Sequence, residues 1–225
     1  MKELSKQLEP KIAAWEQNQY KRTPLRGNPI PGNAATFYAE AESKLEKPNP
    51  GIFYETISDP SKPLTPEAQE YYKRNKPIIE LIKKGTQSET YKPLVNIREG
   101  EDAKTPNLTK VRIIAQIMVL HSRELTKNNR ISESIRLLCN ISRMGDDYMY
   151  RGSLIDAMVG LAISETGDKE IQRVLQDNKL SQQHLTELLG YLKKLLDDRP
   201  NFNNSWEAEG LCIEAVLKQQ AESAG

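Results

Sequence analysis

Two histidines are each followed three positions later by a glutamate: His121 with Glu124, and His184 with Glu187. Residues three apart share one face of a helix, so each pair would present an imidazole and a carboxylate together. These two groups bind transition metals and also perform acid–base catalysis. The chain has no other histidine, and it lacks the common phosphate-loop, dinucleotide, serine-hydrolase, zinc-protease and paired-cysteine motifs. We therefore predict no catalytic residues.

The two pairs resemble, in reverse order, the metal ligands of ferritin-like bundles, which use Glu-x-x-His and a further glutamate from two other helices. Here His121 falls on an apolar stripe and Glu124 points away from it, whereas His184 falls in the first turn of its predicted helix. These four residues are candidate metal ligands only because of this partial resemblance. The prediction is one partly buried histidine, one surface histidine, no metal and no cofactor.

A second cluster combines aromatic rings with an arginine: Tyr148, Tyr150 and Arg151. This composition is enriched at the energetic centres of protein interfaces, so the cluster is a candidate partner surface. The alternative is that the two tyrosines fill a seam between helices. Two acidic pairs, at 146–147 and 197–198, are interpreted as a helix N-terminal cap and a solvated turn.

The elements that must position these residues follow from the prolines, twelve of which lie in the first 106 of 225 residues. Proline disfavours helix interiors, so residues 1–104 are predicted to be a partly irregular wrapping segment with two or three helices. Helices are expected over 3–20, over 34–47 after the cap Asn33, and from Pro66 after the cap Thr65. A short strand is expected at 93–98. Three adjacent ring pairs should anchor this segment to the rest of the chain: Phe37-Tyr38, Phe53-Tyr54 and Tyr71-Tyr72.

Residues 105–225 are predicted to form a body of about six helices, with Gly145 and Gly167 each ending one of them. The apolar stripes of its last helices should face the core. Those stripes comprise Leu154, Ile155, Met158, Leu161 and Ala162; Leu185, Leu188, Leu189, Leu192 and Leu196; and Trp206, Gly210, Ile213 and Leu217.

Two predicted turns share a phrase, Met144-Gly-Asp and Thr166-Gly-Asp, which are 22 residues apart. The segment 131–168 resembles a helical hairpin of the tetratricopeptide kind, although the signature residues of that family are missing. The resemblance implies no binding residues. We predict an all-α fold, either an antiparallel α-hairpin array or an irregular helical bundle, in which residues 1–225 form a single domain.

Composition narrows the function without identifying it. The formal net charge of +1 is too small for a protein that binds nucleic acid mainly through charge. Cys139 and Cys212 are expected to be free thiols, with a single bridge as the alternative. No window of the chain is apolar enough for a membrane span. The expected location is cytoplasmic, or exported or anchored if a leader has been removed.

The leading functional hypothesis is a non-enzymatic interaction or scaffold protein whose partner is another protein, because helical hairpins occur without a recognisable catalytic constellation. One alternative is a small-ligand-binding protein or enzyme with a pocket between the helical body and residues 48–66. A second alternative is the soluble domain of an exported or membrane-anchored envelope protein. The oligomeric state is not predicted.

Overall fold

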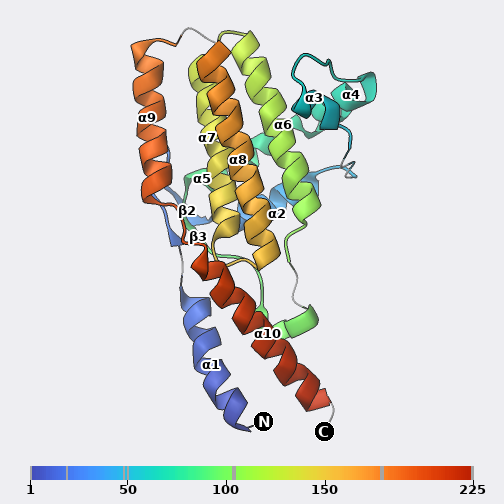
Figure 1. Ribbon diagram of the computed structural model, residues 1–225, viewed down its shortest axis with the longest axis vertical. Coiled ribbons are helices and arrows are strands. Elements are labelled where there is room, and N and C mark those ends of the chain that lie inside the picture. Colours follow the sequence, from blue (N-terminus) through green and yellow to red (C-terminus); the bar gives the residue numbers. More distant parts are fainter. Residues whose placement is uncertain are drawn as a thin grey trace.

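A computed structural model describes residues 2–18, 20–47, 49, 51–102, 105–177 and 180–223, and it is mostly helical (Figure 1). The N-terminal half has five helices and three strands among these residues: α1 (Lys2–Gln17), β1 (Tyr20–Lys21), β2 (Ile30–Asn33), α2 (Ala34–Lys44), α3 (Tyr54–Ser58), α4 (Pro66–Asn75), α5 (Ile79–Gln87) and β3 (Ser88–Tyr91). The 3₁₀ helices are η1 (Lys76–Ile78) and η2 (Ile97–Asp102). The second half comprises α6 (Leu108–Lys127), α7 (Ile131–Met149), α8 (Leu154–Asp177), α9 (Gln182–Asp197) and α10 (Asn203–Ser223).

Helices α6, α7 and α8 stand side by side and form the centre of the molecule (Figure 1). Helix α9 packs on α7, and α10 runs from the end of α8 toward α1 and η2. On another side of α7 lie α2, α5 and a small sheet in the order β1-β3-β2, in which β3 is antiparallel to β1 and parallel to β2. Helices α3 and α4 lie beside α6 (Figure 1).

The main core contains side chains from both halves of the chain. Tyr38, Phe53 and Tyr71 are buried in it together with Ile114 and Leu138 of α6 and α7. The prediction that rings of the first half anchor it to the helices is thus confirmed for these residues. The other ring of one pair, Tyr54, is 69% exposed. A second, smaller core joins α1, η2 and α10 through residues such as Ile12, Trp15 and Ile97.

The predicted helix starts in the first half are confirmed by their caps. The Asn33 side chain accepts a hydrogen bond from the Ala35 N–H, and the Thr65 hydroxyl accepts one from the Ala68 N–H. Pro77 lies in the 3₁₀ turn that separates α4 from α5. The prediction of a strand at 93–98 is wrong. Strand β3 lies earlier, at Ser88–Tyr91, and η2 begins at Ile97.

Two helix ends predicted at glycines are also wrong. Helix α7 continues through Gly145 to Met149, and α8 continues through Gly167 to Asp177. The second half therefore has five helices in its described residues, because the two that were expected to meet at Gly167 are one. Both glycines have helical backbone, so neither ends a helix. Their presence is explained by close packing.

That packing is a close approach of α7 and α8. A Cβ atom built on Gly145 would lie 2.5 Å from the Gly160 carbonyl oxygen and 2.5 Å from the Ser164 backbone nitrogen. The reciprocal Cβ on Gly160 would lie 2.5 Å from the Gly145 oxygen. A Cβ atom built on Gly167 would lie 2.5 Å from the Ser142 hydroxyl oxygen. The contact is with backbone atoms, so only glycine fits at Gly145 and Gly160.

This seam determines which face of α8 is buried. The residues that face α7 must be small, and Ala157, Gly160, Ser164 and Gly167 lie there. The larger apolar residues predicted to face the core therefore point elsewhere. Among them Ile155 and Met158 are each 65% exposed.

We predict that Gly145→Ala lowers the free energy of unfolding by about 2 kcal/mol or more, because the added methyl forces two backbones apart. The matched control is Gly190→Ala on α9, where a Cβ would meet nothing within 4 Å. That variant should be more stable by up to about 1 kcal/mol, since alanine favours helix over glycine. Urea denaturation of both variants measures the difference, and equal effects would contradict the seam.

Candidate functional site

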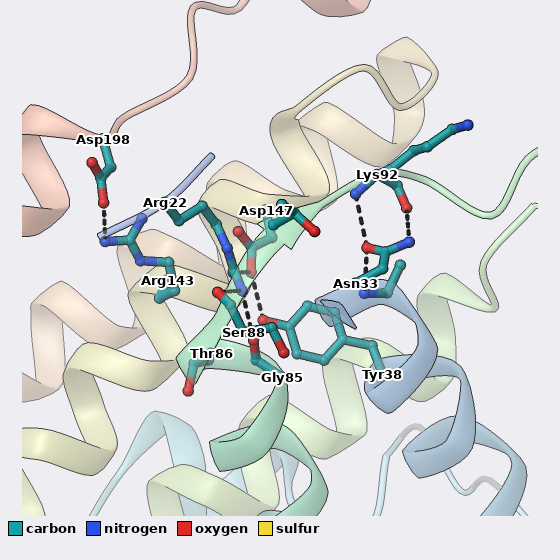
Figure 2. A network of polar contacts seen from close by, with 12 residues as sticks. Arg22, Asn33, Tyr38, Gly85, Thr86, Ser88, Lys92, Arg143, Asp147 and Asp198 are labelled. Atoms are coloured by element: carbon teal, nitrogen blue, oxygen red, sulfur yellow. Dashed lines mark hydrogen bonds and ion pairs between the residues drawn. The ribbon is translucent and has the colours of Figure 1, made fainter. Parts of the chain in front are cut away.

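Polar side chains that the sequence did not suggest as a group meet at the C-terminal half of α7 (Figure 2). Asp147 is fully buried and accepts hydrogen bonds from the Arg22 guanidinium and from the Tyr38 hydroxyl, the latter at 2.5 Å. Arg22 also donates to the carbonyl oxygens of Gly85 at 2.6 Å and Ser88 at 2.7 Å. The network therefore ties the N-terminal segment, α2 and the end of α5 to α7.

A second buried ion pair lies next to it. The side chain of Arg143 is 0% exposed and donates to Asp198 at 2.8 Å. Asp198 also accepts from the Thr23 backbone N–H at 2.7 Å. The expectation of a solvated turn at 197–198 is therefore wrong for Asp198, which joins the end of α9 to α7 and to the segment after β1. The physical reason is Arg143, a buried cation that requires a carboxylate partner.

The chemistry of this network is structural. Burial and the adjacent Asp147 carboxylate raise the pKa of the Tyr38 hydroxyl well above its usual value, so the phenol stays protonated and donates. Desolvation lowers the pKa of Arg22, but Asp147 and Tyr38 together raise it by more, so the guanidinium stays cationic. Arg22 and Asp147 therefore neutralise each other by direct contact. Their ion pair connects segments of the chain and does not face a cavity.

Asp146, the other member of its acidic pair, is different because it reaches a groove. It lies 2% exposed at the base of a groove between α8 and α9, which is also lined by Leu175, Leu192 and Leu196. Burial raises the pKa of the Asp146 carboxyl to about 7, against the opposing effect of Arg199, whose Nε lies 3.3 Å away. The predicted capping role at the start of the next helix is wrong, since α7 continues through Asp146.

The candidate metal ligands lie on two separate helices. His121 and Glu124 are on α6, where Glu124 accepts from Tyr72 at 2.6 Å and from Lys76 at 2.8 Å. These donors lower the pKa of Glu124 to about 2, and burial lowers that of His121. His184, on α9, caps its own helix by accepting from the Ser181 backbone N–H. Glu187 accepts from the hydroxyl of Tyr191, also on α9. In the described segments, no three His, Cys, Asp or Glu side chains cluster as metal ligands do.

The aromatic–arginine cluster is divided by the turn between α7 and α8. Tyr148 is 4% exposed, and its hydroxyl donates a hydrogen bond to Glu42 of α2 at 2.9 Å. It therefore lies between α7 and α2 and not on the surface. Tyr150 is half-buried and stacks on Tyr20, with ring centroids 4.8 Å apart. Arg151 donates to the Trp15 carbonyl oxygen at 3.0 Å. All three residues contact the N-terminal segment of the same chain.

The remaining unusual feature is the set of exposed apolar side chains on α8, α9 and α10. We call this set the α8–α10 face. Eleven of the thirteen large hydrophobic side chains exposed among the described residues belong to it. They are Ile155, Met158, Leu161, Leu175, Leu185, Leu189, Leu196, Phe202, Trp206, Ile213 and Leu217. Most of them belong to the stripes that the sequence predicted to face the core.

The exposure of these stripes has a local cause on each helix. On α9 the side packed against α7 is formed by Leu188, Tyr191 and Leu195, so Leu189 and Leu196 remain 66% and 67% exposed. On α10 the buried side is formed by Ala208 and Ala215, which are small. Periodicity alone predicted that the wrong face of each helix is buried: on α9 the buried residues are of similar or larger size, and on α10 they are alanines.

No family model, curated protein or solved structure matches this chain. The described segments also contain no helix that is both long and apolar enough to cross a membrane. Cys139 of α7 and Cys212 of α10 are free thiols, as the first of the two sequence interpretations predicted.

We predict that Arg22→Met lowers the free energy of unfolding by about 3–5 kcal/mol, because it leaves the buried Asp147 charge without its cation. The control is Lys44→Met, which breaks an exposed pair with Glu40 and should cost less than about 1 kcal/mol. Thermal and urea unfolding provide the comparison. If the two variants lose similar stability, the buried pair does not hold the segment in place.

We also predict that Asp146 makes stability depend on pH. Its pKa is about 7 when folded and about 3.9 when unfolded, so the folded chain binds more protons between these values. The wild type should therefore lose stability as pH rises from about 4 to about 7, by up to about 1.4 kcal/mol per unit of pKa difference. Asp146→Asn should lack this loss. Urea titrations at several pH values test it, and parallel curves for the two proteins would disprove it.

Proposed function

We propose that this protein is a non-enzymatic interaction module that binds amphipathic helices of a protein partner on its α8–α10 face. The observation that carries the proposal is the exposure of apolar stripes on three successive helices. Contiguous apolar surface beyond a few hundred Å² is uncommon on proteins that act alone, and it marks interaction sites. All eleven large side chains are exposed over more than a third of their area.

The spacing of the exposed residues supports a helix as the bound element. On α9 the exposed Leu185, Leu189 and Leu196, together with the partly buried Leu192, follow steps of four, three and four. The α10 stripe Trp206, Gly210, Ile213 and Leu217 repeats the same steps. This is the a/d spacing with which helices pair along a seam, and a partner helix with the same spacing would cover it.

The groove between α8 and α9 supports the same proposal. Its walls carry Ile171 and Leu175 of α8 and Leu192, Leu195 and Leu196 of α9. Helix α9 is attached to the body mainly through α7, and the groove lies on its side toward α8. Consecutive α-hairpins of this kind, as in tetratricopeptide-like arrays, use such surfaces to hold peptides and helices. A hairpin array within a single domain is the architecture we propose for the chain.

The proposal is tested by photo-cross-linking in the source cells. A photoreactive amino acid placed at Leu189 or Ile213 should cross-link to the same protein, and mass spectrometry should locate the bond in a helix with four–three apolar spacing. The control position is Gln183, which is exposed on α9 but away from the stripe. A second copy of this chain is one possible partner and would be recognised by its own peptides.

We predict that Leu189→Glu with Leu196→Glu abolishes the cross-link from Ile213 while leaving the melting temperature almost unchanged, because both side chains are already exposed. The matched control, Gln183→Glu with Thr186→Glu, adds the same charge to α9 and should leave the cross-link intact. The proposal is wrong if both double variants behave alike, or if positions 189 and 213 yield no protein cross-link.

A further inference from the structure

A cavity of about 710 Å³ lies on the opposite side of α8 from the α9 groove, beneath the loop that joins α3 to α4. Pro60, Pro63 and Leu64 of this loop form one wall, and α6 and α8 form the other. The sequence suggested a pocket between the helical body and residues 48–66. The cavity lies under the second half of that segment, while Pro48 and Pro50 fall outside the described residues. Its volume is within the range of small-molecule sites, about 300–1,000 Å³.

The cavity has a strong excess of positive charge. Its lining includes six cationic side chains and two carboxylates, in a chain whose net charge is only +1. The cations are Lys62, Lys73, Lys76, Arg123, Lys127 and Arg173, and the acids are Glu124 and Glu170.

The carboxylates are already engaged by cations of the lining. Glu170 is 6% exposed and pairs with both Arg123 and Arg173. Glu124 pairs with Lys76 at 2.8 Å. Lys62 and Lys73 have carboxylate partners only outside the lining, on exposed residues, and Lys127 has no ion pair among the described residues. The lining therefore has cationic capacity that its own acids do not neutralise.

The uncharged part of the lining combines polar residues with an apolar patch. Leu120 and Val174 are buried at the base, and Leu64 and the two loop prolines cover it. A fully hydrated inorganic anion would gain little from such walls, whereas an organic anion could bury an apolar body there and keep its charged group near the lysines.

The cavity is held open by a fixed contact at its edge. Arg123 donates to the carbonyl oxygens of Thr56 at 2.7 Å and Ile57 at 3.2 Å, and its guanidinium is also bound by Glu170 at 2.6 Å. These bonds fasten the end of α3 to α6 and α8. Glu170 carries one negative charge against the two guanidinium groups of Arg123 and Arg173, so a positive charge beside Arg173 is left unbalanced. Lys127 has no ion pair among the described residues, and the pairs of Lys62 and Lys73 are solvent-exposed and therefore weak.

We propose that this cavity binds a small organic anion with an apolar aromatic or alkyl body, independently of helix binding on the α8–α10 face. The acidic group of the ligand lies near Lys127 and Arg173, and its apolar body lies against Leu64 and Leu120. No covalent step is involved, so the site is one of binding and not of catalysis.

The test uses naphthalene-2-sulfonate as the probe and naphthalene-2-sulfonamide as its neutral analogue, with binding to the whole chain measured by calorimetry. The sulfonate should bind at one site, at least tenfold more tightly than the sulfonamide, and more weakly as salt increases. Lys127→Gln with Lys62→Gln should weaken sulfonate binding at least fivefold. Both lysines are exposed, so this variant should keep the wild-type melting temperature.

Two controls separate this cavity from other surfaces. Lys193→Gln with Lys169→Gln removes two exposed lysines elsewhere and should leave the affinity unchanged, which excludes a general charge effect. Leu189→Glu with Leu196→Glu should also leave it unchanged, which excludes binding to the α8–α10 face. The proposal is overturned if the sulfonate does not bind at millimolar concentration, if the sulfonamide binds equally well, or if the Lys127 and Lys62 variant has no effect.

Discussion

The contact of backbone on backbone between α7 and α8 is the constraint on which the rest of this structure depends. Gly145 and Gly160 leave no room for a single methyl group between the two helices. An approach this close selects the smallest face of α8 for burial, and it is accompanied by serines that add polar contacts, such as the Ser142 hydroxyl to Asp168 at 3.0 Å. Ile155, Met158 and Leu161 of α8 are consequently turned outward, where they begin the α8–α10 face.

The buried ion pairs have a complementary effect on the other half of the chain. Arg22, directly after the short strand β1, pairs with Asp147 of α7. Arg143 of α7 pairs with Asp198 at the end of α9, which also accepts a hydrogen bond from the Thr23 backbone N–H. This anchors the proline-rich segment on the side of α7 that carries α2, α5 and the sheet (Figure 2). Most of this segment covers the α6–α7 side of the body, while α1 and η2 pack on one side of α10. The large apolar side chains on the other sides of α8, α9 and α10 remain exposed.

Local sequence signals predicted the helical class and several boundaries, because caps such as Asn33 and Thr65 act through neighbouring atoms alone. They failed at Gly145 and Gly167, where a glycine that suits a helix end also suits a helix contact. Periodicity located the apolar stripes but could not say which of two adjacent faces is buried, since that depends on the partner helix. Small residues seven apart, Gly160 and Gly167, were the available signal for the seam. The pairing of Arg22 with Asp147 spans 125 residues and has no local signal.

The central claim is that the α8–α10 face is exposed in the isolated chain and covered in its native assembly. Oxidative footprinting measures this directly, because Met158 and Trp206 are 65% and 60% exposed while Met118 and Met144 are buried internal references. We expect Met158 and Trp206 to be oxidised much faster than the references in the purified protein, and to become protected in intact source cells. Protection already in the purified monomer, or undiminished oxidation in cells, would contradict the account.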